Sequence, residues 1–143
     1  YRLDEIRASL GINQLKRINS LNSKRFLASK YYSKQLEEIS GIITPEIFRK
    51  KEHTYHLYII RIKNEFGQNR DEVFKELKKV GIQVSLHYKP LHRFSAYRNL
   101  TKTYGRLDNS EQIYKESLSL PLYPSISKKQ QDLVINNIKN YKV

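Results

Sequence analysis

Histidine is the residue type in this sequence best suited to chemistry, because an imidazole serves as a general base and as a metal ligand near neutral pH. The chain has four histidines among its 143 residues. His87 ends an alternating segment that resembles a strand, and Tyr88, Lys89-Pro90-Leu91 and His92 follow it directly. Ligands commonly bind at strand ends in α/β folds, so His87 is the first candidate for a binding residue. A structural histidine that caps a turn is the alternative.

His53 and His56 are candidate metal ligands only by their spacing. Two residues three positions apart on a strand point to opposite faces, so this pair could chelate a metal only if the segment is not a strand. We therefore do not expect a metal site. The chain has no cysteine, which excludes thiolate ligands and disulfides. Its five glycines are isolated, so it has no glycine-rich phosphate loop, and no serine stands in a recognisable nucleophile motif.

Two strands and one helix are expected around His87. The β-branched and aromatic run 54–62 predicts a central strand. Asn69 and Glu72 have the spacing of a capping box, and the apolar stripe after them predicts a helix that closes at Gly81. Alternation of apolar and polar residues over 82–88 predicts a half-buried strand that ends at Lys89-Pro90 and places His87 on its polar face.

Further helices are expected at both ends of the chain. Leu3, Ile6 and Leu10 predict a short helix that is interrupted or bent near Gly11, and a longer helix follows over 18–39. A short helix with a loop is expected in 94–104, a helix in 110–118, an extended path over 120–124, and a last helix after the capping box Ser127/Gln130. The pattern predicts one domain of the α/β (α+β) class, with a small mixed or antiparallel sheet packed against helices.

The net charge of +13 and the pI near 9.9 raise the possibility of a basic nucleic-acid-binding module. However, the lysines and arginines are spread along the helices, and no run reaches five like charges, so a solvated surface is favoured and nucleic acid is not the expected partner. No apolar run approaches the roughly 18 residues that span a bilayer, so we expect no membrane contact and a cytoplasmic protein. The chain contains no methionine and begins with Tyr1, which indicates a piece of a larger protein.

Several segments together resemble the C-terminal part of the DegT/DnrJ/StrS family of pyridoxal phosphate-dependent nucleotide-sugar aminotransferases. Tyr1-Arg2-Leu3 and the following helix resemble the family's Asn-Tyr-Arg motif, although the asparagine is missing. His56–Arg61 resembles the central strand, and the segment from Gly81 to His92 resembles the one that approaches the cofactor. The remaining matches are Arg70–Gly81 with the next helix, Tyr97 with an aromatic turn, and Ser117–Pro124 with the closing signature.

The resemblance implies that residues 1–143 form the C-terminal small domain of a fold-type I aminotransferase. It implies a homodimeric parent that uses pyridoxal phosphate to move an amino group from an amino acid, usually glutamate, to a nucleotide-linked keto sugar in polysaccharide or glycan biosynthesis. In the family the Schiff-base lysine lies in the upstream domain, and nothing here resembles its surroundings. We therefore expect no bound cofactor, no catalytic residue and no activity in this segment alone.

The resemblance also assigns roles to individual residues. Arg2 is expected to face the cofactor and a carboxylate or phosphate, which suits a guanidinium fork, and the adjacent Tyr1 is expected at the same binding site. His87 is expected in the substrate pocket with Tyr88 and His92 as neighbours, and His56 is expected to be a structural group near the site. Relatives that dehydrate their sugar or that have lost catalysis remain possible, because the difference lies in the upstream domain.

Overall fold

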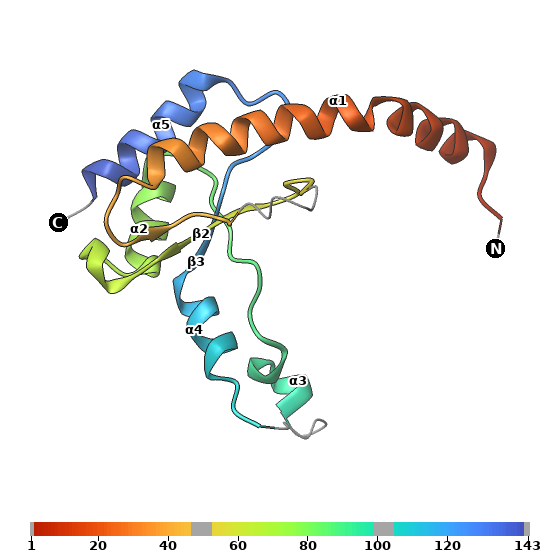
Figure 1. Ribbon diagram of the computed structural model, residues 1–143. Coiled ribbons are helices and arrows are strands. Elements are labelled where there is room, and N and C mark those ends of the chain that lie inside the picture. Colours follow the sequence, from red (N-terminus) through yellow and green to blue (C-terminus); the bar gives the residue numbers. More distant parts are fainter. Residues whose placement is uncertain (1, 47–52, 99–104, 142–143) are drawn as a thin grey trace.

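A three-stranded antiparallel sheet forms the centre of the protein (Figure 1). The computed structural model describes residues 2–46, 53–98 and 105–141. The strands β1 (Ile42–Ile43), β2 (Tyr58–Ile62) and β3 (Ser117–Leu120) lie in the order β1-β2-β3. In this register Ile62 pairs with Ile42, and Ile60 pairs with Leu118. The expected fold class, a small antiparallel sheet packed with helices, is confirmed.

Helix α1 (Glu5–Leu36) is a single helix of 32 residues, so the expected division into a short helix before Gly11 and a longer helix after it is wrong. Asp4 caps it by accepting a hydrogen bond from the backbone N–H of Arg7 at 2.8 Å. A glycine inside a helix costs only about 1 kcal/mol relative to alanine, so one glycine does not end a long helix. All of the buried residues of α1 lie from Ala28 onward, and its first half projects away from the sheet (Figure 1).

The hydrophobic core lies between one face of the sheet and three helices, which are the end of α1, α2 (Arg70–Lys79) and α5 (Lys128–Asn140). Alternate residues of β2 point into it, as expected for a strand with one covered face. The fully buried large side chains are Tyr32, Leu36, Tyr58, Ile60, Phe66, Val73, Leu77, Leu118 and Ile138. Both α2 and α5 begin with the expected capping boxes, Asn69/Glu72 and Ser127/Gln130.

The segment 82–88 is extended but is not a regular strand, which corrects the sequence prediction. Its described pairing is a single bridge between Ser85 and Ser119 of β3. Ile82 and Val84 are buried, whereas Tyr88 is 73% exposed. Alternating apolar residues indicate that every second side chain is buried. An extended segment that packs on a sheet has this pattern as well as a paired strand, so the pattern alone does not predict strand pairing.

The remaining elements are short. They comprise the 3-10 turns η1 (Asn64–Phe66) and η2 (Leu91–Arg93) and the helices α3 (Ser95–Arg98) and α4 (Asp108–Glu116). The helix expected over 110–118 therefore ends earlier, because its last two residues belong to β3. The central strand begins at Tyr58, which leaves His56 before it. Part of the expected short helix and loop, 99–104, lies outside the described residues. Within the described ranges, no helix has both the length and the apolar character that a bilayer crossing needs.

Candidate functional site

His87 is fixed by a hydrogen bond from an element that is distant in sequence. Its Nδ1 lies 2.7 Å from Oγ of Ser119, which belongs to β3. The ring of His87 is half-buried, and Ser119 is 4% exposed. The bridge between Ser85 and Ser119 sets this geometry, because it holds the extended segment against the strand two residues before the histidine. The structure thus places His87 at an ordered position beside the sheet.

Ser119 and His87 have the spacing of a nucleophile and its base, but Ser119 is too deeply buried to reach a substrate. The arrangement suits binding rather than covalent chemistry, because one ring nitrogen is held and the other forms no hydrogen bond within the described part of the chain. Tyr88 packs edge-on against the imidazole, with 4.7 Å between ring centroids. His87 and Tyr88 therefore form one small polar and aromatic surface.

His92 belongs to a separate ion-pair cluster that joins η2 to α4. Its Nε2 lies 2.5 Å from Glu111 Oε1, and Nε of Arg93 donates to the same oxygen at 2.8 Å. A second guanidinium nitrogen of Arg93 pairs with Oε2. Hydrogen bonds from Arg93 and then from His92 lower the pKa of the Glu111 carboxyl to about 2. His92 is thus engaged by a carboxylate that keeps the turn after His87 in place.

The structure does not bring the other expected site residues into contact with His87. Arg2 is exposed at the end of the arm that α1 forms, and Figure 1 shows this arm pointing away from the green segment that carries His87. Tyr1 lies outside the described residues. His56 is exposed in the bend before β2. His53 is also exposed, and its Nδ1 accepts the backbone N–H of Tyr55 at 2.8 Å.

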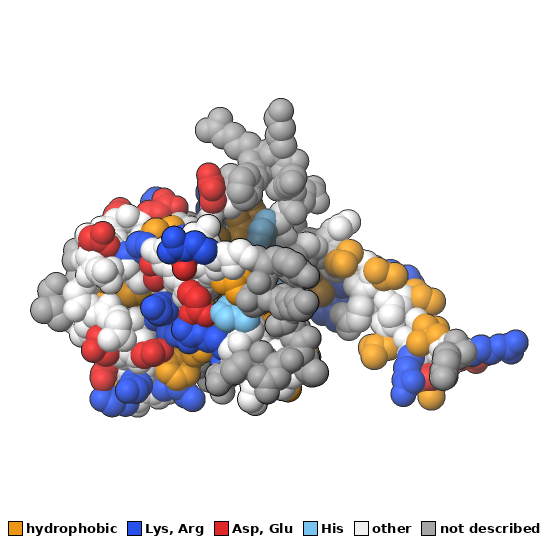
Figure 2. Space-filling view, turned by 90° about the horizontal axis from the view of Figure 1, so that it is seen from below, with side chains coloured by type: hydrophobic (Ala, Val, Ile, Leu, Met, Phe, Trp, Pro, Cys, Tyr) orange, Lys and Arg blue, Asp and Glu red, His pale blue; other side chains and the backbone are white. Residues whose placement is uncertain are grey.

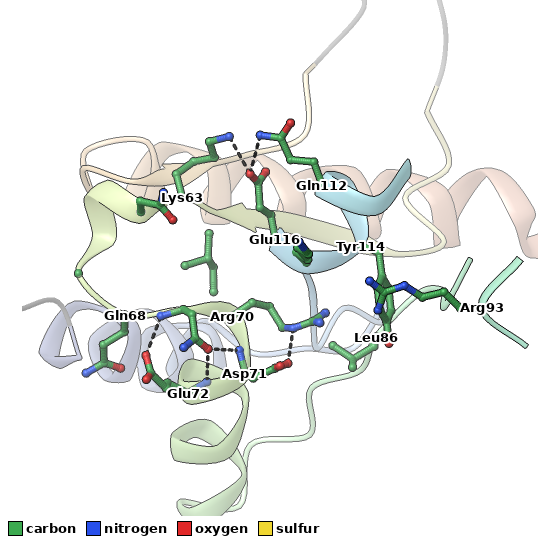
Figure 3. A pocket seen from close by; sticks show the side chains of 15 residues that line it. Lys63, Gln68, Arg70, Asp71, Glu72, Leu86, Arg93, Gln112, Tyr114 and Glu116 are labelled. Atoms are coloured by element: carbon green, nitrogen blue, oxygen red, sulfur yellow. Dashed lines mark hydrogen bonds and ion pairs between the residues drawn. The ribbon is translucent and has the colours of Figure 1, made fainter. Parts of the chain in front are cut away.

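A cavity of about 970 Å³ lies between β2, the start of α2 and α4, and Arg93 is one of its lining residues (Figure 3). Four of its charged side chains form two ion pairs with one another, Lys63 with Glu116 and Arg70 with Asp71. Burial raises the pKa of the Glu116 carboxyl, but hydrogen bonds that it accepts from Lys63 at 2.8 Å and from Arg61 at 2.9 Å lower it, so its pKa lies below the usual value. Arg70 is buried and pairs with Asp71 at 2.6 Å. These pairs make the wall a structural network that connects the sheet to two helices.

Tyr114 joins this network to the histidine region. The guanidinium carbons of Arg70 and Arg93 each lie 5.2 Å from the centroid of its ring. Arg93 also holds Glu111, so the cavity wall, η2 and His92 are mechanically connected. Figure 3 shows Tyr114, Arg93 and Leu86 together at one end of the cavity.

No group of three or more His, Cys, Asp or Glu side chains that could hold a metal occurs among the residues that the structure describes. His87 could be identified from the sequence, whereas its partner Ser119 and Glu111, which bridges η2 and α4, could not. No local pattern indicates either residue. Ser119 lies 32 positions from His87, and Glu111 lies 18 and 19 positions from its partners Arg93 and His92.

Comparison with known proteins adds a family assignment to this geometry. The model of the DegT/DnrJ/EryC1/StrS aminotransferase family matches residues 1–139. The chain is 36% identical, over 134 residues, to the UDP-4-amino-4,6-dideoxy-N-acetyl-beta-L-altrosamine transaminase of Campylobacter jejuni subsp. jejuni. That match covers 94% of this chain and 35% of the transaminase. The chain therefore spans about a third of the length of this relative.

Solved aminotransferase structures also match nearly the whole of this chain but only a little more than a third of their own length. The Helicobacter pylori aminotransferase PseC, involved in the biosynthesis of pseudoaminic acid, aligns with a TM-score of 0.89 and 26% identity. The alignment covers 99% of this chain and 38% of PseC. The pyridoxal phosphate form of the sugar aminotransferase Spr1654 from Streptococcus pneumoniae aligns with a TM-score of 0.84 and 30% identity. It covers 99% of this chain and 36% of Spr1654.

Proposed function

The chain belongs to the DegT/DnrJ/EryC1/StrS aminotransferase family, and we propose that it is the C-terminal domain of a longer, pyridoxal phosphate-dependent sugar aminotransferase. In that enzyme an amino group passes from an amino acid, glutamate in this proposal, to the keto group of a nucleotide-linked sugar. The observation that carries the proposal is the extent of the match. It takes in nearly all of this chain but only 35% of the Campylobacter transaminase.

The exposed first half of α1 supports a larger parent protein. The projecting arm exposes six large apolar side chains: Leu3, Ile6, Leu10, Ile12, Leu15 and Ile18. Figure 2 shows hydrophobic side chains, in orange, along this arm. Full burial of one such side chain stabilises a protein by about 1.5–3 kcal/mol. We propose that this apolar arm packs on the part of the parent that is absent from this chain. The parent is proposed to be a homodimer, as the family resemblance implies.

The proposed ligand-facing residues are His87, Tyr88 and Arg2. A fixed imidazole and an exposed guanidinium are groups that bind carboxylate, phosphate and hydroxyl oxygens, which fits a substrate or cofactor rich in oxygen. Tyr88 adds an exposed aromatic surface beside the imidazole of His87. We propose a peripheral place for His56 and a role for His92 in holding η2 through Glu111.

The lysines of this chain support the proposal that the cofactor is held elsewhere. Bound pyridoxal phosphate supplies an electron sink, and the lysine that carries it needs a desolvated setting. Every described lysine is exposed except Lys63, which is half-buried and paired with Glu116 at 2.8 Å. We therefore propose that the chain contributes binding and orientation to the parent enzyme and is inactive alone.

An amino-transfer assay on the full-length protein that contains this segment tests the proposal. The substrates are glutamate and the UDP-linked 4-keto sugar that corresponds to the product of the Campylobacter transaminase. We expect 2-oxoglutarate and amino sugar to form in equal amounts, and no turnover by the 143-residue chain in the parallel control. Consumption of the keto sugar without 2-oxoglutarate would identify a dehydratase instead, and complete inactivity of the full-length protein would contradict the proposal.

A further inference from the structure

The hydrogen bond between Ser119 and His87 has a direction that the surrounding structure decides. The backbone N–H of Ser119 donates to the carbonyl of Ser85 at 2.9 Å, and its own carbonyl accepts from Ser85 at 3.2 Å. These bonds leave the side-chain hydroxyl of Ser119 with one partner among the described residues, which is Nδ1 of His87. The hydroxyl is nearly sealed from water, since the residue is 4% exposed.

Buried donor hydrogens are rarely left without an acceptor, whereas an oxygen with two lone pairs more often keeps one of them unpaired. If Nδ1 of the neutral ring carried the proton, Ser119 would have to accept, and its own hydrogen would have no acceptor among the described groups. If Ser119 donates, both groups are satisfied. The hydroxyl of Ser119 therefore donates to Nδ1, and the proton of the neutral imidazole resides on Nε2.

We propose that Ser119 is a positioning residue that fixes the tautomer and the orientation of His87, so that Nε2–H points toward the substrate as a hydrogen-bond donor. The acceptor it suits is an oxygen of the substrate, such as that of a phosphate, carboxylate or sugar hydroxyl group. This last step rests on the proposed function, whereas the tautomer itself does not. Ser119 contacts no substrate and acts only through the histidine.

Ser117 provides a matched control on the same strand. It lies two positions before Ser119, so it shares a face of β3, and it is equally buried at 5% exposure. Its carbonyl accepts a hydrogen bond from Arg70 at 2.9 Å, whereas the hydroxyl that binds Nδ1 of His87 is that of Ser119. The Ser117→Ala and Ser119→Ala variants remove the same atom from neighbouring buried sites, and only the second removes the bond to the imidazole.

The first arm of the test measures the tautomer by long-range ¹H–¹⁵N NMR correlation on the 143-residue chain near pH 8, where histidine is largely neutral. We expect Nδ1 of His87 to be unprotonated and hydrogen-bonded in the wild type and in Ser117→Ala. In Ser119→Ala its ring signals should move toward those of the exposed His56, which serves as an internal reference. A proton on Nδ1 in the wild type, or unchanged signals in Ser119→Ala, would overturn the proposal.

A Ser119→Thr variant distinguishes loss of the hydrogen bond from a folding defect. Threonine keeps the hydroxyl and should restore the wild-type ring signals.

The second arm uses the full-length enzyme. There Ser119→Ala should raise KM for the nucleotide sugar by about 3- to 10-fold with kcat nearly unchanged, as expected for the loss of one oriented hydrogen bond. An unchanged KM with the predicted tautomer would retain the positioning role and refute its use in substrate binding. An inactive wild-type enzyme would instead refute the proposed function.

Discussion

Replacement of Gly41 by alanine should destabilise the fold strongly, because two separate costs coincide at this residue. Gly41 has φ +81°, a left-handed conformation that alanine adopts at a cost of about 1–2 kcal/mol. A Cβ atom there would also lie 2.2 Å from the backbone nitrogen of Phe66 and 2.6 Å from its Cα. Backbone atoms cannot rotate away as a flexible side chain can, and forced overpacking costs about 1–3 kcal/mol. The expected total is about 2–5 kcal/mol.

Gly81 separates the two costs experimentally. Its φ of +78° is nearly the same, but an added Cβ meets no atom within 4 Å. Gly81→Ala should therefore lose only the conformational part, about 1–2 kcal/mol. In urea unfolding followed by circular dichroism, with an m-value of about 1–3 kcal/mol/M, Gly41→Ala should have a clearly lower midpoint than Gly81→Ala. Equal midpoints for the two variants would refute the close approach between Gly41 and the turn that carries Phe66.

Three further predictions concern charge, exposure and a buried hydroxyl. The folded pKa of Glu111 is depressed to about 2, so its stabilising effect is complete above its unfolded pKa of about 4.3 and is lost as the pH falls toward 2. Urea midpoints of Glu111→Gln should accordingly lie below the wild type near pH 6 and converge with it near pH 2; a pH-independent difference would contradict this. We also expect the exposed apolar arm to cause self-association of the 143-residue chain. The double substitution Ile6→Ser and Leu10→Ser should reduce this association in sedimentation experiments with little change in the unfolding midpoint, and unchanged association would contradict a role of the arm. Tyr58→Phe should cost about 1–2 kcal/mol in urea unfolding, because Ser33 loses its 2.9 Å hydrogen-bond partner, and an unchanged midpoint would exclude that bond.

The helices with local start signals could be predicted from the sequence. A capping box needs only two residues three positions apart, so Asn69/Glu72 and Ser127/Gln130 are visible without tertiary information. Strands β1 and β3 were not predicted. β1 has two residues, and the Ser-Leu-Ser-Leu sequence of β3 has no β-branched residue, so its strand geometry comes from pairing with β2.

The candidate site was predicted only in part, because it also depends on contacts between segments that are distant in the sequence. His87 could be identified because its alternating segment ends there, and this segment does lie beside the sheet. Ser119 could not, because its contact with His87 depends on how two distant segments dock. The placement of Arg2 and His56 at the same site stays a prediction. Arg2 lies on the projecting arm and His56 in an exposed bend, and neither contacts His87 within this chain.

Locating the cofactor in the full-length protein tests directly whether its lysine lies outside this chain. Borohydride reduction of the protein loaded with pyridoxal phosphate, followed by peptide mapping, fixes the cofactor on the lysine that carries it. We expect one stoichiometric label on a lysine outside the 143 residues of this sequence, and none when the 143-residue chain is treated alone. A stoichiometric label on a single lysine within these residues would contradict the claim that this chain serves as a binding domain without the cofactor's lysine.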